Sequence, residues 1–227
     1  MARWLIKLEG QLADLDEYVT WFPSGEIFAI REDTDVFLAG PVFERLPDAE
    51  AVVKDAERQL ALLTGIAALL WPSLRKPAID RVMREQDDGT RNSFIFVFAT
   101  ASARAKVTAT LADSSGPTQA QGLLNSAIQS PHLLLAVSLW GEKLKSWPRL
   151  YRILEEIEQH LGARVDEVGF CSYAERERFT RTANNAEVAG SDSRHASRKF
   201  QAPANPVELS EAVSFVARML QAALRQP

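Results

Sequence analysis

Apolar and polar residues alternate in several short runs along the first half of the chain, which is the pattern of half-buried β-strands. In one of these runs, 103–111, every second residue is apolar. Asp88-Gly89 separates two of the runs, and this pair favours a tight hairpin turn. The pattern therefore predicts an antiparallel sheet. The runs comprise residues 3–9, 26–30, 35–40, 79–85, 92–100 and 103–111.

One long amphipathic helix is expected within this sheet-forming half. Asp48 follows Pro47 and is suited to cap the helix start. Apolar residues then recur at helical spacing from Val52 to Leu70, and Pro72 ends the pattern because proline cannot continue the hydrogen-bond ladder. The first half is therefore expected to combine a sheet with this one long helix.

From residue 117 onward the spacing of apolar positions is helical. We expect the last helix to begin near residue 205, with Pro206 in its first turn. Ser, Gly and Pro collect at 112–119, which indicates a boundary between an α+β domain at 1–112 and a helical domain at 113–227. The fold class predicted is α+β, with an N-terminal antiparallel sheet followed by a C-terminal helical bundle. The other helices expected are 118–129, 132–144, 147–162 and 173–185.

Composition narrows the class of protein. Hydrophobic residues make up 46% of the chain and the net charge is −4, so disorder and broad non-specific binding to nucleic acid are disfavoured. The single cysteine, Cys171, excludes an internal disulfide and a multi-cysteine zinc site. Three scattered histidines give no metal-ligand spacing, and we expect neither a metal nor a cofactor. No apolar run approaches the ~20 residues of a membrane helix, and we expect a cytoplasmic protein.

Familiar catalytic motifs are absent from the sequence. It contains no GxGxxG, Walker A, HExxH or GxSxG pattern. The acid pair Asp87-Asp88, the charged stretch 175–178 and Cys171 each have a structural interpretation, as a turn, a solvated helix face and a buried thiol. His132 and His160 flank apolar runs and are interpreted as structural as well. The sequence leaves open whether the protein is an enzyme.

The stretch "RTANNAEVAGSDSRHA" at 181–196 suspends the apolar pattern. Between Arg176 and Lys199 there are six Lys or Arg and three acids, a local surplus of positive charge in an acidic chain. Arginine grips phosphate or carboxylate in bidentate fashion, histidine titrates near neutral pH, and asparagine offers amide donors. The segment 181–199 is therefore a candidate anion- or partner-binding loop. Its candidate residues are Arg181, Asn184, Asn185, Arg194, His195 and Arg198.

The same residue types also form ordinary helix caps and connectors. A loop of about twenty residues is longer than most, and long loops are more often functional or disordered. Both interpretations of this loop stay open at the level of sequence.

Residues 147–224 resemble a widespread group of uncharacterised bacterial proteins. The resemblance rests on "LYRILE" in the helix after Trp147, "RTANN" at 181–185, "RHA" at 194–196 and a final helix after "NP" at 205–206. No biochemical role comes with that group.

The helical layout also resembles HEPN domains, which are compact helical bundles that often dimerise and are frequent in toxin and anti-phage systems. Active members cut RNA without a metal, using an arginine and a histidine just before the last helix and separated by four to six residues. Here Arg194 and His195 precede the last helix and are adjacent. The resemblance would make His195 the general acid or base and Arg194 the group that neutralises developing charge.

Two functions are therefore expected. The first is a bacterial binding or interaction protein, linked to toxin or anti-phage defence, that recognises a protein partner or an anionic ligand through the 181–199 loop. The second is a metal-independent ribonuclease of HEPN type using Arg194 and His195. RNA and a second copy of the chain are candidate partners, and a membrane is not.

Overall fold

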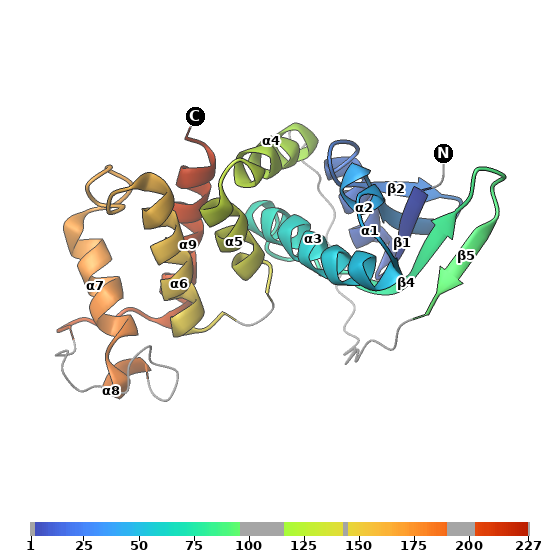
Figure 1. The fold of residues 1–227 in the computed structure, drawn as a ribbon. Helices are drawn as coiled ribbons and strands as arrows, with labels where there is room; N and C mark the ends of the chain where they lie inside the picture. Colours follow the sequence, from blue (N-terminus) through green and yellow to red (C-terminus); the bar gives the residue numbers. More distant parts are fainter. Residues whose placement is uncertain (1–2, 96–115, 143–144, 190–202, 227) are drawn as a thin grey trace. The chain divides into compact units, whose positions relative to one another are not determined.

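The structure is a computed structural model that describes residues 3–95, 116–142, 145–189 and 203–226 (Figure 1). The chain divides into two compact units, Met1–Gly122 and Leu123–Pro227. Helix α4, Gly116–Ile128, contains the point of division. The sequence-based boundary at 112/113 lies before this helix.

The first unit is built on a five-stranded sheet in which every pair of neighbouring strands is antiparallel. The strand order is β2-β3-β1-β4-β5. Together with the helices this confirms the α+β class. The strands are β1 Arg3–Glu9, β2 Phe28–Glu32, β3 Asp35–Ala39, β4 Ala78–Glu85 and β5 Arg91–Phe94. The predicted run 92–100 is described only as far as residue 95, and the run 103–111 lies outside the described residues.

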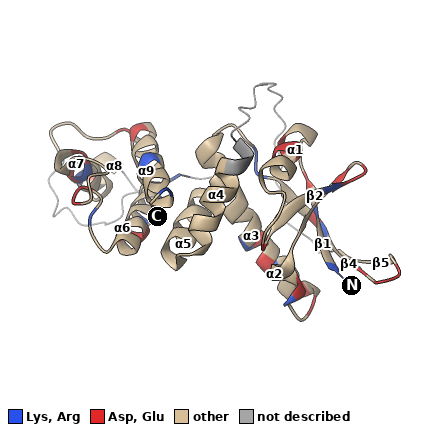
Figure 2. Ribbon diagram, turned by 90° about the horizontal axis from the view of Figure 1, so that it is seen from above, with Lys and Arg blue, Asp and Glu red and all other residues tan. Residues whose placement is uncertain are grey.

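Three helices of this unit lie on one side of the sheet, as Figure 2 shows: α1 Leu12–Trp21, α2 Pro41–Glu44 and α3 Ala49–Leu70. Asp48 caps α3 as expected, because its Oδ1 accepts a hydrogen bond from the backbone N–H of Ala51 at 2.9 Å. The hydroxyls of Tyr18 and Thr64 are 3.0 Å apart and join α1 to α3 inside the core. The short helix α2 has no counterpart among the elements expected from the sequence.

The other side of the sheet carries a small apolar cluster. Leu5, Phe37, Ala39 and Met83 are buried there, and Phe28 and Ile30 pack against them. These residues alternate along their strands with those that face the helices, so apolar side chains are buried on both faces of the sheet.

Four charged side chains join the two edges of the sheet across this cluster. Arg3 donates to Glu32 at 2.8 Å and also to Glu85, while Arg91 donates to Glu85 at 2.7 Å and also to Glu32. Among the described strands, Glu32 belongs to β2 at one edge of the sheet and Arg91 to β5 at the other edge. In a flat sheet these edges would be about 19 Å apart at ~4.8 Å per strand. The contact between them therefore shows that the sheet curls around the apolar cluster.

The second unit is helical. Helix α6, Trp147–Leu161, contacts α5, α7 and α9 and presents its buried Leu150, Leu154 and Ile157 to the core. It ends at Gly162, whose positive φ of 63° fits the left-handed turn that commonly ends helices. The other helices are α5 Pro131–Trp140, α7 Tyr173–Ala183, α8 Ala186–Ala189 and α9 Leu209–Leu224.

The start of the last helix differs from expectation. Helix α9 begins at Leu209 with Glu208 as its N-cap residue, so Pro206 lies before the helix and not in its first turn. The reason is tertiary. Arg178 of α7 binds the carbonyls of Asn205 and Pro206, and Val207 N–H donates to the hydroxyl of Thr182 at 3.1 Å. The carbonyls of Asn205 and Pro206 and the N–H of Val207 therefore bind side chains of α7, and the segment stays non-helical.

The network of Arg3, Arg91, Glu32 and Glu85 across the sheet makes the stability of the first unit depend on pH. Hydrogen bonds from Arg3 and then Arg91 hold the pKa of Glu85 below its ordinary value. A lowered carboxyl pKa contributes stability above the unfolded pKa, and this contribution is lost as the pH falls through the folded pKa. Glu85→Gln should therefore lower the free energy of unfolding at pH 7 by about 1 kcal/mol, the upper end for solvent-accessible pairs.

Urea unfolding followed at pH 7 and at about pH 3.5, below the ordinary range of glutamate, measures this difference. The difference between wild type and Glu85→Gln should shrink at the lower pH. Glu57→Gln, at an exposed position of α3, is the matched control and should differ little from wild type at either pH. An equal loss at both pH values would contradict the electrostatic origin.

Candidate functional site

Three of the six candidate loop residues, Arg194, His195 and Arg198, lie outside the described residues. The other three are described and point to different places. Arg181 lies exposed on α7, where its Nε donates to Glu177 one turn earlier at 2.7 Å. Asn184 and Asn185 are buried at the end of the same helix.

Both asparagines bind backbone. Asn184 Nδ2 donates to the carbonyl of Thr180 at 2.9 Å, and within the described part of the chain its buried Oδ1 has no hydrogen-bond partner. Asn185 Oδ1 accepts from the N–H groups of Glu187 and Val188, which caps the short helix α8. The structure thus places these two residues at the junction of α7 and α8 and does not bring them together with Arg181.

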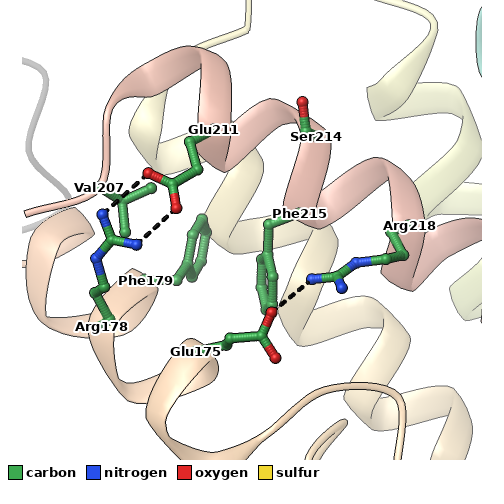
Figure 3. A pocket seen from close by; sticks show the side chains of 8 residues that line it. All are labelled: Glu175, Arg178, Phe179, Val207, Glu211, Ser214, Phe215 and Arg218. Carbon is green, nitrogen blue, oxygen red and sulfur yellow. Dashed lines mark hydrogen bonds and ion pairs between the residues drawn. The ribbon is translucent and has the colours of Figure 1, made fainter.

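A hollow of ≈ 270 Å³ lies between α7 and α9, close to the segment that follows the candidate loop (Figure 3). Two aromatic side chains form its floor, and two arginine–glutamate pairs stand on either side of them. Each pair joins one helix to the other. The residues that line the hollow are Glu175, Arg178, Phe179, Val207, Glu211, Ser214, Phe215 and Arg218; we refer to it as the α7–α9 pocket.

The floor of the α7–α9 pocket is part of an aromatic cluster. The rings of Phe179 and Phe215 stack with centroids 5.2 Å apart, and both side chains are almost fully buried. Trp147 and Tyr151 of α6 contact Phe179 from behind, with centroids 6.0 and 6.2 Å from its ring. Stacked aromatic pairs stabilise by about 0.5–1.5 kcal/mol beyond the area they bury, so the floor is firmly held.

Arg178 lies at one end of the pocket (Figure 3). Its Nη1 and Nη2 donate to the two carboxylate oxygens of Glu211 at 2.6 and 3.0 Å. Its Nε donates to the carbonyl of Asn205 at 2.6 Å, and Nη2 also donates to that of Pro206 at 3.0 Å. All three nitrogens of this guanidinium are therefore engaged, and the planar bidentate pairing fixes its orientation.

Arg218 and Glu175 lie at the other end of the pocket (Figure 3). Arg218 Nη2 donates to Glu175 Oε1 at 3.0 Å, and the guanidinium lies 5.7 Å from the centroid of the Phe215 ring. Glu175 also receives hydrogen bonds from the N–H and hydroxyl of Ser172, with which it forms a capping box at the start of α7. The Ser172 N–H, and after it Arg218, lower the pKa of Glu175, so this carboxyl is charged at neutral pH.

Sequence reasoning missed this pocket. It interpreted 175–178 as a solvated helix face and did not single out the aromatic or charged residues of the last helix. A signal was present, because Glu175 and Arg178 are three residues apart on α7 and Glu211 and Arg218 are seven apart on α9. Such spacings place each pair on one helix face. Each helix thus carries one glutamate and one arginine on a single face. The sequence alone does not show that these two faces meet, which is what pairs Arg178 with Glu211 and Arg218 with Glu175.

A second polar cluster joins α5 to α6. Nδ1 of His132 lies 2.7 Å from Oε2 of the buried Glu156, which also pairs with Arg152. Nδ1 of His160 lies 3.0 Å from the hydroxyl of Ser130, the N-cap residue of α5. Both histidines thus hold one helix to the other, in line with their structural interpretation. Burial, and then the proximity of His132, lower the pKa of His160.

Other titratable side chains of interest have structural surroundings. Burial, followed by Glu175 and Asp166, raises the pKa of Cys171 and so disfavours a reactive thiolate. Burial and then Arg149 lower the pKa of Lys145 to about 8, and its amine donates to the carbonyls of Trp140 and Glu142 after α5. Asp88 accepts from the N–H and hydroxyl of Thr90 in the β4–β5 turn, as expected for a turn residue.

Two further kinds of feature are absent from the described ranges. Within them, no group of three or more His, Cys, Asp or Glu side chains is placed to hold a metal ion. No helix among them is long and apolar enough to cross a membrane. Comparison of the chain with protein-family models, curated proteins and solved structures finds no match.

The lowered pKa of His160 predicts a loss of stability in mild acid. Between the folded and unfolded pKa values the unfolded chain binds more protons, so the free energy of unfolding falls as the pH drops below about 6.5. His160→Asn should remove this part of the loss, a few tenths of a kcal/mol for a partly exposed group. NMR titration of the His160 ring should give a midpoint below that of a free histidine.

His132→Asn provides the complementary test. Removing the neighbouring imidazole should raise the midpoint of His160 toward its ordinary value, because His132 is the second cause of the shift. A midpoint for His160 above that of free histidine in the wild-type protein would contradict the assignment.

Proposed function

We propose that the helical unit is a binding module that recognises a ligand or a partner protein through the α7–α9 pocket. The observation that carries this proposal is the arrangement of a stacked aromatic floor between two arginine–glutamate pairs (Figure 3). Pockets that bind small molecules combine apolar walls with a few placed polar groups, and this pocket has the same composition.

The size of the pocket limits what enters it. A volume of ≈ 270 Å³ is just below the range of about 300–1,000 Å³ typical of ligand sites. A small molecule, or one apolar side chain of a larger partner, is the appropriate guest. Such a group would contact the small exposed part of Phe215 on the pocket floor, and the charged pairs on either side would orient its polar parts.

The candidate loop is linked to this pocket through the chain. Arg178 of α7 lines the pocket shortly before the loop begins, and Val207 lines it shortly after the loop ends. We therefore keep Arg194, His195 and Arg198 in the proposal as further partner contacts. Anti-phage association, a homodimer and a cytoplasmic location stay predictions from the sequence.

A neutral aromatic probe tests the proposed pocket. N-acetyl-L-phenylalaninamide should perturb the amide NMR signals of α7 and α9 in the wild-type protein. Phe215→Leu keeps an apolar floor and removes the ring, so the affinity should fall about 2- to 13-fold, the equivalent of about 0.5–1.5 kcal/mol of aromatic stacking.

Phe43→Leu is the matched control, since it makes the same change at a buried position of the first unit. It should leave the affinity of the probe unchanged. Probe-induced shifts that avoid α7 and α9, or equal affinity in wild type and Phe215→Leu, would argue against the pocket.

The second function predicted from the sequence, metal-independent ribonuclease activity, has its own test. It is supported by the resemblance to HEPN domains and by the surplus of Lys and Arg between Arg176 and Lys199. A ribonuclease of this type should degrade RNA in EDTA, and His195→Ala should abolish the activity because the general acid or base is lost. RNA left intact by the wild-type protein in EDTA would exclude this function.

A further inference from the structure

We propose that the ligand of the α7–α9 pocket carries a single carboxylate attached to an aromatic group, and that Arg218 binds this carboxylate while Phe215 receives the ring. The inference rests on the proposed function of the pocket. It adds the chemical class of the ligand and the residue that selects it.

The two arginines of the pocket differ in the donors they have left. Arg178 uses Nε, Nη1 and Nη2 on Glu211, Asn205 and Pro206. Arg218 makes one hydrogen bond within the described part of the chain, from Nη2 to Glu175, and about half of its side chain is exposed. A guanidinium offers five N–H donors. Arg218 is therefore the arginine of this pocket that can accept a further anionic partner.

The first unit shows that one guanidinium accommodates two carboxylates. Arg3 binds both Glu32 and Glu85, and Arg91 binds the same two residues. Arg218 can bind a ligand carboxylate in the same manner while keeping Glu175. If the ligand displaces Glu175, that side chain keeps its hydrogen bonds from Ser172, so the start of α7 stays capped.

The charge of the pocket favours a monoanion over a dianion. Two arginines and two glutamates line it, so its side chains sum to zero, and both carboxylates lie beside their arginines. A dianion such as phosphate would add two negative charges next to Glu175 and Glu211. A carboxylate adds one, and its planar shape matches the fork of a guanidinium.

The position of Phe215 determines what the carboxylate is attached to. Its ring stands between the two charged ends of the pocket and lies 5.7 Å from the Arg218 guanidinium (Figure 3). An aromatic ring that enters the pocket and contacts the small exposed part of Phe215 would therefore place a nearby carboxylate at Arg218. Two sources offer this chemistry, a free aromatic acid and the C-terminal aromatic residue of a partner chain.

Paired probes of equal shape and different charge test the inference on the full chain. NMR titrations at pH 7.5 compare N-acetyl-L-phenylalanine, which has a carboxylate, with N-acetyl-L-phenylalaninamide, which has none. The acid should bind about fivefold more tightly than the amide, a modest gain because Arg218 is partly exposed. Arg218→Gln should abolish this preference. Arg58→Gln, at an exposed arginine of α3, should preserve it.

Each contrary outcome has a distinct meaning. Equal affinity for acid and amide, or a preference that persists in Arg218→Gln, overturns the carboxylate assignment and leaves the binding module in place. Tighter binding of phenyl phosphate than of the acid overturns the preference for a monoanion. Failure of both phenylalanine probes to bind overturns the proposed function together with this inference.

A further arm identifies the source of the carboxylate. A tetrapeptide that ends in phenylalanine with a free C-terminus is compared with its amidated form and with the single acid. Tighter binding of the free-ended peptide than of the single acid supports a partner chain as the source, and equal affinity supports a free aromatic acid. A peptide whose amidated form binds equally well overturns recognition of the carboxylate.

Discussion

The guanidinium of Arg178 is the contact on which the arrangement of α7 and the start of α9 depends. It binds the carbonyls of Asn205 and Pro206 and the carboxylate of Glu211. These contacts hold the segment before α9 against α7. Thr182 supports it through the N–H of Val207. Without these contacts, α9 would be expected to start earlier, with Pro206 in its first turn. Val207 would then no longer line the pocket in the same way.

The first unit uses the same chemistry for a different purpose. Arg3 and Arg91 share Glu32 and Glu85, and this network joins the opposite edges of the sheet over the buried Phe37. Isolated ion pairs near a surface contribute little to stability. The contribution of a network depends more on the geometry of its contacts than on how many ion pairs it contains. In both units, therefore, the arginine–glutamate contacts mainly set the position of elements that are distant in the sequence, while apolar burial supplies most of the stability.

Local patterns in the sequence were sufficient for the elements but not for the site. Alternation predicted β1 and β4 closely, and Asp48 and Gly162 mark the ends of helices where capping chemistry places them. The predicted helix start near residue 205 was wrong, because the preference of Pro206 for a first turn is weaker than the tertiary contacts that hold Asn205–Val207. The curl of the sheet and the α7–α9 pocket were not predictable, since both depend on pairings such as Arg91 with Glu32 and Arg218 with Glu175. The first pair is separated by 59 positions in the sequence and the second by 43, and no local rule specifies contacts over such separations.

The two charged pairs of the pocket differ in the number of hydrogen bonds that their arginines make within the described residues. Helices α7 and α9 are held together by Arg178 and by the stacking of Phe179 on Phe215, with Trp147 behind. The pair of Arg218 and Glu175 adds one more hydrogen bond between α9 and α7, and Ser172 gives Glu175 hydrogen bonds that do not depend on Arg218. Under the proposed function, a ligand that took over the Arg218 contact would leave the Arg178 pair and the aromatic cluster to hold α7 against α9.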